Sequence, residues 1–153
     1  MRVLELKVPP VALLAIFAIV IYGVARLTPG AILIIPGKEI IGAILVFFGA
    51  LVVSLGVLAF RSHKTTVNPL TPGESSVIVQ DGIYRVTRNP MYLGFLFLLS
   101  AWAIFLSNAF AALALPLFVA YMNQYQIKPE ERVLLAKFGP EFSTYMSTVR
   151  RWL

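Results

Sequence analysis

The chain has 153 residues, a length that fits one domain comprising residues 1–153. Hydrophobic residues make up 59% of it and charged residues only 13%, against about 25% charged in soluble domains, which indicates an integral membrane protein. The absence of cysteine excludes disulfides and a cysteine nucleophile, and one histidine is too few for a metal site without several carboxylates. The net charge of +6 favours anionic lipid headgroups over nucleic acid, because the basic residues lie beside apolar runs.

Residues 8–27 form the first apolar run and are long enough to cross a bilayer, which takes roughly 20 residues. Arg2 and Lys7 give the run a basic start, so a cleaved signal peptide is the alternative. The run is long for the apolar part of such a peptide and no A-x-A cleavage site follows it, which favours a membrane helix. Residues 31–37 are apolar but too short to span, and we expect them to form an interfacial loop.

The second apolar run, residues 40–60, contains no charge. Gly42, Gly49 and Gly56 recur in it every seven residues, which is nearly two helical turns, so they lie on one face of a helix. Small residues let neighbouring backbones approach closely in lipid. We therefore expect this face to pack against another helix.

Residues 91–107 and 109–127 form two further apolar runs, separated by Asn108. This spacing predicts a helical hairpin with a tight turn, in which Pro116 kinks the second helix. The expected fold is therefore all-α with four transmembrane helices, two at the N-terminal end and then the hairpin. With four spans, the N-terminus, the loop of residues 61–90 and the C-terminal tail share one side of the membrane.

Lysine and arginine are distributed unequally between the two sides of this arrangement. Eleven of the thirteen lie on the side of the termini, and only Arg26 and Lys38 lie on the other. Basic residues accumulate in cytoplasmic loops. We therefore expect both termini to be cytoplasmic, in the inner membrane of a bacterium or an archaeon.

The tail, residues 128–153, has a different character. Pro129, Glu130 and Glu131 indicate a helix start, because proline suits the first turn and acidic side chains complement the positive end of the helix dipole. A second short helix follows. We interpret the tail as amphipathic helices that lie on the membrane, with residues 150–152 as an interfacial anchor.

Two polar clusters lie on the side of the termini. The stretch 82–94 places Arg88, Asn89 and Tyr92 at the entrance of the third span, and Glu130 follows the fourth span. Polar groups at such a depth are costly unless they bind something. The hairpin returns the chain to the side from which it entered, so Asn89, Tyr92 and Glu130 are expected to line one pocket at the cytoplasmic interface.

The expected pocket has definite chemical capacities. Pro90 fixes the helix start, where free N–H groups can hold a carboxylate. Tyr84 and Tyr92 offer flat faces for an adenine or for a positive ligand, and Glu130 can accept hydrogen bonds from an amino group or from ribose hydroxyls. These groups suit a zwitterionic, nucleoside-bearing ligand with a cationic centre. A polar network that only caps the helices and anchors them to headgroups is the alternative.

Two separated blocks of the sequence match a known pattern. The first is Gly82-Ile83-Tyr84 with Arg88-Asn89-Pro90-Met91-Tyr92-Leu93-Gly94, and the second is Glu130-Glu131 followed by Phe138-Gly139 and Tyr145. These blocks resemble the isoprenylcysteine carboxyl methyltransferase family, and the phospholipid methyltransferases have a similar tail. The resemblance covers about residues 61–153. The order of the two blocks around a helical hairpin makes it fairly specific.

The resemblance implies S-adenosylmethionine as the cofactor, held between the hairpin and the cytoplasmic loops without a Rossmann domain. Carried over by position, it implies a set of cofactor-binding residues: Ser76, Val77, Ile78, Val79, Tyr84, Asn89, Pro90, Met91, Tyr92 and Glu130. On the acceptor side we expect Gln126 and Asn68, since the segment around Asn68 leads into the cofactor loop. No catalytic residue is assigned.

Two positions depart from the family pattern. Asn89 stands where the family usually has histidine, and asparagine keeps the hydrogen bonding but does not titrate near neutral pH. Gln126 stands where the eukaryotic prenylcysteine enzymes have an arginine that would meet the substrate carboxylate.

The expected function is a membrane-embedded, S-adenosylmethionine-dependent methyltransferase whose acceptor is a lipophilic small molecule or a prenylated substrate. The methylated group is a carboxylate, a thiol or an amine, and the residues do not choose among them. Membrane lipids are the expected surroundings, without nucleic acid or metal. A non-catalytic membrane protein that binds lipid or a partner helix is the alternative, since the glycine stripe and the basic interface fit it equally well. A related reductase with a nicotinamide cofactor is disfavoured, because no site for a second phosphate is obvious.

Overall fold

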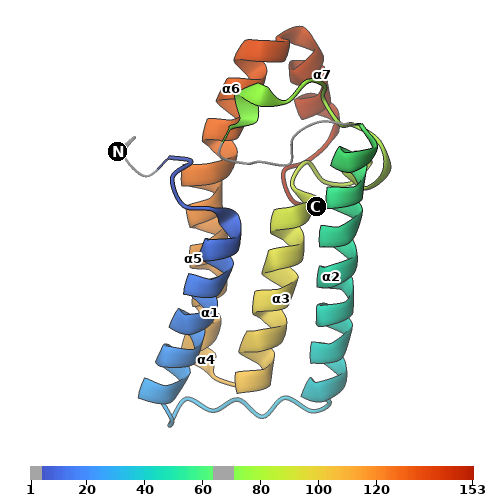
Figure 1. The fold of residues 1–153 in the computed structure, drawn as a ribbon. Coiled ribbons are helices and arrows are strands. Elements are labelled where there is room, and N and C mark those ends of the chain that lie inside the picture. Colours follow the sequence, from blue (N-terminus) through green and yellow to red (C-terminus); the bar gives the residue numbers. More distant parts are fainter. Residues whose placement is uncertain (1–4, 64–70) are drawn as a thin grey trace.

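The computed structural model of the protein describes residues 5–63 and 71–153. Within these ranges the regular elements are helical, apart from one isolated bridge between Ile32 and Asn108. Figure 1 shows the long helices side by side, with the C-terminal helices at one end of them. The elements are α1 (Pro10–Leu27), α2 (Lys38–Ser62), η2 (Pro72–Glu74), η3 (Gly82–Arg85), α3 (Pro90–Leu106), α4 (Ala109–Ala112), α5 (Ala114–Tyr121), the π-helix η4 (Met122–Ile127), α6 (Lys128–Phe138) and α7 (Pro140–Thr148). The all-α expectation is confirmed for this part of the chain.

Helices α1 and α2 are long and apolar enough to cross a membrane. Only 17% and 11% of the residues in their most apolar windows are buried, whereas the core helix of a soluble protein would be mostly buried. Their side chains therefore meet an apolar surrounding, as in a membrane protein. Helix α3 is apolar but has 17 residues, which is roughly 26 Å of helix. The arrangement with four spans stays a proposal.

Helix α3 lies between α1 and α2, and its two sides are packed differently (Figure 1). On the side of α1 and α5, large side chains pack closely. The ring centroids of Phe17 on α1 and Phe118 on α5 are 5.3 Å apart, and Leu99 on α3 is 1% exposed. Trp102 adds a hydrogen bond from its indole N–H to the carbonyl of Ala18, at 3.1 Å. Together these contacts fix α3 against α1 and α5.

Toward α2, the backbones meet closely across a seam of glycines. A β-carbon on Gly94 would lie 2.5 Å from Val53 Cγ2 and 2.7 Å from the carbonyl oxygen of Gly49, so only glycine fits. A β-carbon on Gly56 would lie 3.2 Å from Pro90 Cγ. The packing role expected for Gly49 and Gly56 is confirmed. The same expectation for Gly42 is wrong, because nothing lies within 4 Å of a β-carbon there.

At the end of the bundle away from the termini, residues 31–37 cross beneath the helices (Figure 1). The backbone N–H of Leu33 donates to Ser107 at 2.7 Å, and that of Ala109 donates to Ala31 at 2.9 Å. Asn108 caps α4 by accepting from the N–H of Ala111 at 3.0 Å. The turn expected at Asn108 is therefore held against the connection between α1 and α2.

The fourth apolar run is segmented at its prolines. Pro116 lies in the first turn of α5, and α4 ends at Ala112, four residues earlier. Proline cannot donate to the carbonyl four residues before it, and its ring crowds that carbonyl. The kink expected at Pro116 is thus a break between α4 and α5.

The helix start expected at Pro129, Glu130 and Glu131 coincides with the start of α6 at Lys128, and Pro129 lies in its first turn. The backbone stays helical from the π-helix η4 into α6, so α6 prolongs the fourth segment away from the bundle (Figure 1). The carbonyl of Tyr125, which Pro129 cannot pair with, accepts the N–H of Leu6 at 3.0 Å instead. The wider π turn and this outside donor let the chain pass through the proline.

The tail packs back onto the bundle, and its expected place on the membrane surface stays a prediction. Helix α7 turns back toward the bundle, and the chain ends beside the start of α3 (Figure 1). The Arg151 guanidinium binds Glu131, and the Trp152 indole N–H donates to Asn123 Oδ1 at 3.1 Å. Side chains that suited a lipid interface instead satisfy polar groups of the protein.

Candidate active site

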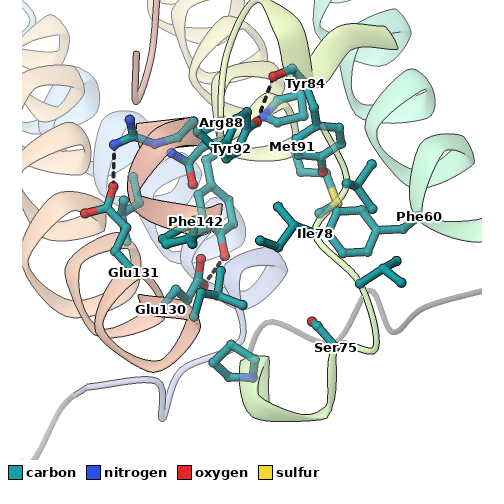
Figure 2. Close-up of a pocket in the computed structure, with 18 residues that line it drawn as sticks. Phe60, Ser75, Ile78, Tyr84, Arg88, Met91, Tyr92, Glu130, Glu131 and Phe142 are labelled. Atoms are coloured by element: carbon teal, nitrogen blue, oxygen red, sulfur yellow. Dashed lines mark hydrogen bonds and ion pairs between the residues drawn. The ribbon is translucent and has the colours of Figure 1, made fainter. Parts of the chain in front are cut away.

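A pocket with a cavity volume of about 110 Å³ lies at the end of the bundle where the chain terminates. Figure 2 shows Phe60 and Ile78 on one side and Glu130 with Tyr92 on the other. The wall is built by the end of α2, the loop before α3, the first turn of α3, and α6 with α7. Segments far apart in sequence therefore meet here.

The first turn of α3 forms one wall of the pocket. Pro90 is the first helical residue, so the helix loses no hydrogen bond to it. Asn89 donates from Nδ2 to the carbonyl of Arg151 at 2.9 Å, and the Thr87 hydroxyl donates to the same carbonyl at 3.0 Å. These two hydrogen bonds tie the tail to the loop that enters α3, and they occupy one amide hydrogen of Asn89.

Glu130 and Tyr92 face one another across the pocket. The Tyr92 hydroxyl donates to Glu130 Oε1 at 2.5 Å (Figure 2). Burial raises the pKa of Glu130 to about 8, although the hydrogen bond from Tyr92 acts in the opposite direction. No ion pair to Glu130 is found in the described part of the chain. Its carboxyl group is therefore a polar group without charge compensation in a largely apolar wall.

The neighbouring Glu131 has the opposite environment. Arg88 Nη2 donates to Oε1 at 2.6 Å, and Arg151 reaches both carboxylate oxygens, at 2.9 and 2.6 Å. Burial raises the pKa of Glu131, but the hydrogen bonds from Arg151 and Arg88 outweigh it and hold that pKa below its ordinary value. Glu131 is therefore ionised and fully paired at neutral pH.

Arg88 also fixes the tail. Its Nη1 donates to the carbonyl of Met146 at 2.8 Å and to that of Val149, at the C-terminal end of α7. A cation suits this end of a helix, where the carbonyls are unpaired. One arginine thereby joins the entrance of α3, the acid on α6 and the end of α7.

Aromatic side chains make up the rest of the pocket. The rings of Phe60 and Tyr84 meet edge to face at 5.4 Å, and Phe142 and Tyr145 come from α7. The Tyr145 hydroxyl donates to the carbonyl of Tyr84 at 2.7 Å. Burial raises the pKa of both tyrosines, so their phenols stay neutral. Neutral aromatic faces can stack on a planar ring or attract a cation.

Most of the residues expected at the cofactor line this pocket, namely Val77, Ile78, Val79, Tyr84, Asn89, Pro90, Met91, Tyr92 and Glu130. Ser76 is exposed and is not among the lining residues. Gln126 is 1% exposed and lies outside the lining as well. Asn68 falls outside the described residues. Whether these side chains bind a cofactor or an acceptor stays a prediction.

The structure adds residues to the pocket that the sequence did not single out for it. They are Phe60, Pro72, Ser75, Arg88, Ile127, Glu131, Leu134, Phe142 and Tyr145. The spacing of Phe142 and Tyr145 on one face of α7 was a usable signal, because residues three apart on a helix are neighbours. That apolar face covers the pocket rather than the membrane.

The chain folds into a helical bundle with two apolar helices of membrane-spanning length and a pocket at one end. Residues 38–141 match the family of phospholipid methyltransferases, and this stretch includes most of the pocket. The chain belongs to the phospholipid methyltransferase family. The relationship expected from the two sequence blocks is thereby confirmed.

Curated relatives agree with this assignment. A "Probable protein-S-isoprenylcysteine O-methyltransferase" of Oryza sativa subsp. indica is 26% identical over 113 residues, which cover 74% of this chain and 59% of the rice protein. The japonica subspecies has a relative with the same figures. An "Uncharacterized protein" of Haemophilus influenzae is 46% identical over 63 residues, 41% of this chain and 100% of that protein. No solved structure matches the chain.

Proposed function

We propose that the protein is a membrane-embedded methyltransferase that uses S-adenosylmethionine and acts on a lipophilic acceptor. The observation that carries the proposal is the pocket at which the entrance of α3 meets Glu130. The family supplies the reaction class, and the rice relatives supply the precedent of a membrane-associated acceptor. The pocket lining offers aromatic faces and a carboxyl group, which suit a nucleoside and a cationic centre.

The chemistry of the lining residues fits this cofactor. When bound, S-adenosylmethionine supplies a methyl group on a positively charged sulfur. Glu130 is the carboxyl group that would balance a positive charge, and Tyr84 with Phe60 offers neutral ring faces to an adenine. The first-turn N–H groups of Met91 and Tyr92 are the free donors of α3, and they would receive a carboxylate.

The apolar part of the lining is the proposed place of the acceptor. Ile127 and Leu134 on the fourth helical segment and Phe142 on α7 form an apolar wall beside Glu130. Holding the two reactants at a fixed distance supplies much of the rate of such a transfer, because it removes the entropic cost of their encounter. Carboxylate, thiol and amine acceptors all remain candidates, with membrane lipids or a prenylated molecule as the source.

The alternative, a non-catalytic membrane protein, predicts a different structure for this region. It would be favoured if the segment from Tyr84 to Gly94 packed against the tail with no cavity between them. The pocket lies between these segments, and it contains a carboxyl group without an ion pair in the described chain. Both features support a ligand site over simple packing.

Ligand binding to the purified protein in detergent or lipid nanodiscs tests the proposal. We expect S-adenosylmethionine and S-adenosylhomocysteine to bind, and Tyr92→Phe and Glu130→Ala to weaken the binding of S-adenosylmethionine about tenfold, since each removes one hydrogen bond or charge near the ligand. Glu141→Ala is the matched control, because Glu141 is exposed, lies outside the pocket lining and accepts a hydrogen bond from Gln80 at 3.3 Å. Failure of the wild-type protein to bind either S-adenosylmethionine or S-adenosylhomocysteine would reject the proposal.

A further inference from the structure

Glu130 and Glu131 are adjacent acids, and their electrostatic environments differ. Glu131 has two arginines on it, and its charge is balanced within the protein. Glu130 has one neutral donor, the Tyr92 hydroxyl at 2.5 Å. A carboxylate in an apolar site is costly unless a positive charge meets it. The protein thus supplies a partner for one acid and leaves the other to be balanced by a proton or by a ligand.

Among the described residues, the titratable groups that act on Glu130 are uncharged or negative. Tyr92 of α3 donates a hydrogen bond to it, and the negative charge of Glu131 on α6 opposes its ionisation. Tyr84 of η3 and Tyr145 of α7, which line the same pocket, are neutral. Arg88 lines this pocket too, but Arg88 and Arg151 are engaged with Glu131, and Arg88 also with the end of α7. The free protein therefore holds Glu130 as a neutral acid over much of the neutral pH range, in line with its raised pKa.

We propose, on the basis of the function proposed above, that Glu130 distinguishes a cationic ligand from a neutral one by exchanging a proton. When a positively charged ligand enters, the Glu130 carboxylic acid releases its proton to solvent and the carboxylate pairs with the ligand. When the ligand in the pocket is neutral at that position, the carboxylate has no partner and takes a proton back. The charge is conserved in each step, because one proton leaves for each positive charge that arrives.

This device has a functional consequence for a methyltransferase. Transfer of the methyl group converts a sulfonium into a neutral thioether, so the ligand loses the charge that Glu130 recognises. The pocket then binds the product, S-adenosylhomocysteine, less tightly than the donor, S-adenosylmethionine. Glu130 would thereby favour release of the spent cofactor and its replacement by a fresh one.

Titration calorimetry of the wild-type protein tests the inference without measuring activity. Binding heats in buffers of different ionisation enthalpy give the number of protons released. At pH 7 we expect S-adenosylmethionine to release close to one proton more than S-adenosylhomocysteine, since a group with a pKa of about 8 is mostly protonated there. Both ligands carry the same amino acid end, so the difference isolates the sulfonium charge.

The pH dependence gives a second readout. Between pH 6 and 7 the affinity for S-adenosylmethionine should rise about tenfold, because a proton must leave Glu130, and the affinity for S-adenosylhomocysteine should stay flat. Glu130→Gln, which keeps an acceptor for Tyr92, should abolish both the extra proton and the slope. Glu141→Gln should keep both, because it changes an exposed acid outside the pocket.

The outcomes separate this inference from the proposed function. Binding of both ligands with equal proton release and parallel pH profiles would overturn the role of Glu130 and leave the methyltransferase proposal standing. Binding of neither ligand would reject the proposed function itself. Persistence of the extra proton in Glu130→Gln would assign the titration to another group and also overturn the inference.

Discussion

Arg88 lies between three elements, and its removal should destabilise the protein more than the loss of a surface charge does. The side chains of Arg88 and Glu131 are 9% and 11% exposed, so breaking their pair leaves a buried charge without a partner. We expect Arg88→Met to lower the stability by about 3–5 kcal/mol, as for other buried pairs from which one partner is removed. Thermal unfolding in detergent measures the loss, and Arg85→Met, at an exposed position, is the control. An equal effect of the two variants would contradict the structural role of Arg88.

Glu131 gives this cluster a defined pH dependence. Its pKa in the folded protein is held below the ordinary value of 4.5, so the ion pairs contribute stability that is fully present above pH 4.5. That contribution is lost as the pH falls through the lowered pKa of the folded state. We expect the midpoint of thermal unfolding to fall on acidification below pH 4.5, and Glu131→Gln to fall less over that interval. A larger acid sensitivity in Glu131→Gln than in the wild type would contradict the sign.

The seam between α2 and α3 positions the pocket, because these two helices carry Phe60 and Tyr92 to it. A β-carbon on Gly94 would meet the backbone of α2 at 2.7 Å, and a backbone atom cannot turn aside as a side chain can. We expect Gly94→Ala to cost about 1–3 kcal/mol of stability and to weaken ligand binding. Gly42→Ala is the matched control, since its β-carbon would meet open space. Equal unfolding midpoints in the two variants would contradict the close seam.

The elements of the bundle were predictable from the apolar runs, because each run is long enough to cover several helical turns. The meeting of Tyr92 with Glu130 was predictable too, since a hairpin must return to the side from which it came. The packing of the tail against the bundle was not predictable. An apolar face such as that of Phe142 and Tyr145 satisfies the same pattern against lipid or against protein.

The helical register of Gln126 relative to Glu130 could not be predicted from the sequence either. In an ideal α-helix, Gln126 and Glu130 would share a face because they are four residues apart. The π-helix η4 has wider turns and rotates the residues before it relative to those after it. Gln126 is therefore buried outside the pocket while Glu130 lines it. The trigger for the wider turn lies in Pro129 and in the distant donor of Leu6, which local patterns do not connect.

At the scale of the whole molecule, the pocket, the start of α1 and the C-terminus lie at one end of the bundle, and Arg26 and Lys38 lie toward the other (Figure 1). The excess of basic residues near the pocket predicts that this end faces the cytoplasm. The chain has no cysteine, so one introduced cysteine is a unique label. In intact bacterial cells expressing the protein, a membrane-impermeant maleimide should label Gly30→Cys at once and Ser143→Cys only after permeabilisation. The reverse pattern would contradict the orientation.

The central claim is that the pocket between α3 and α6 binds S-adenosylmethionine. An experimental structure of the protein in lipid or detergent, determined with saturating S-adenosylhomocysteine, tests this most directly. We predict ligand density enclosed by Tyr84, Tyr92, Glu130 and residues 77–79, with the sulfur on the Glu130 side of the pocket. Density for the ligand at another place, or a pocket filled by protein side chains at saturation, would contradict the claim.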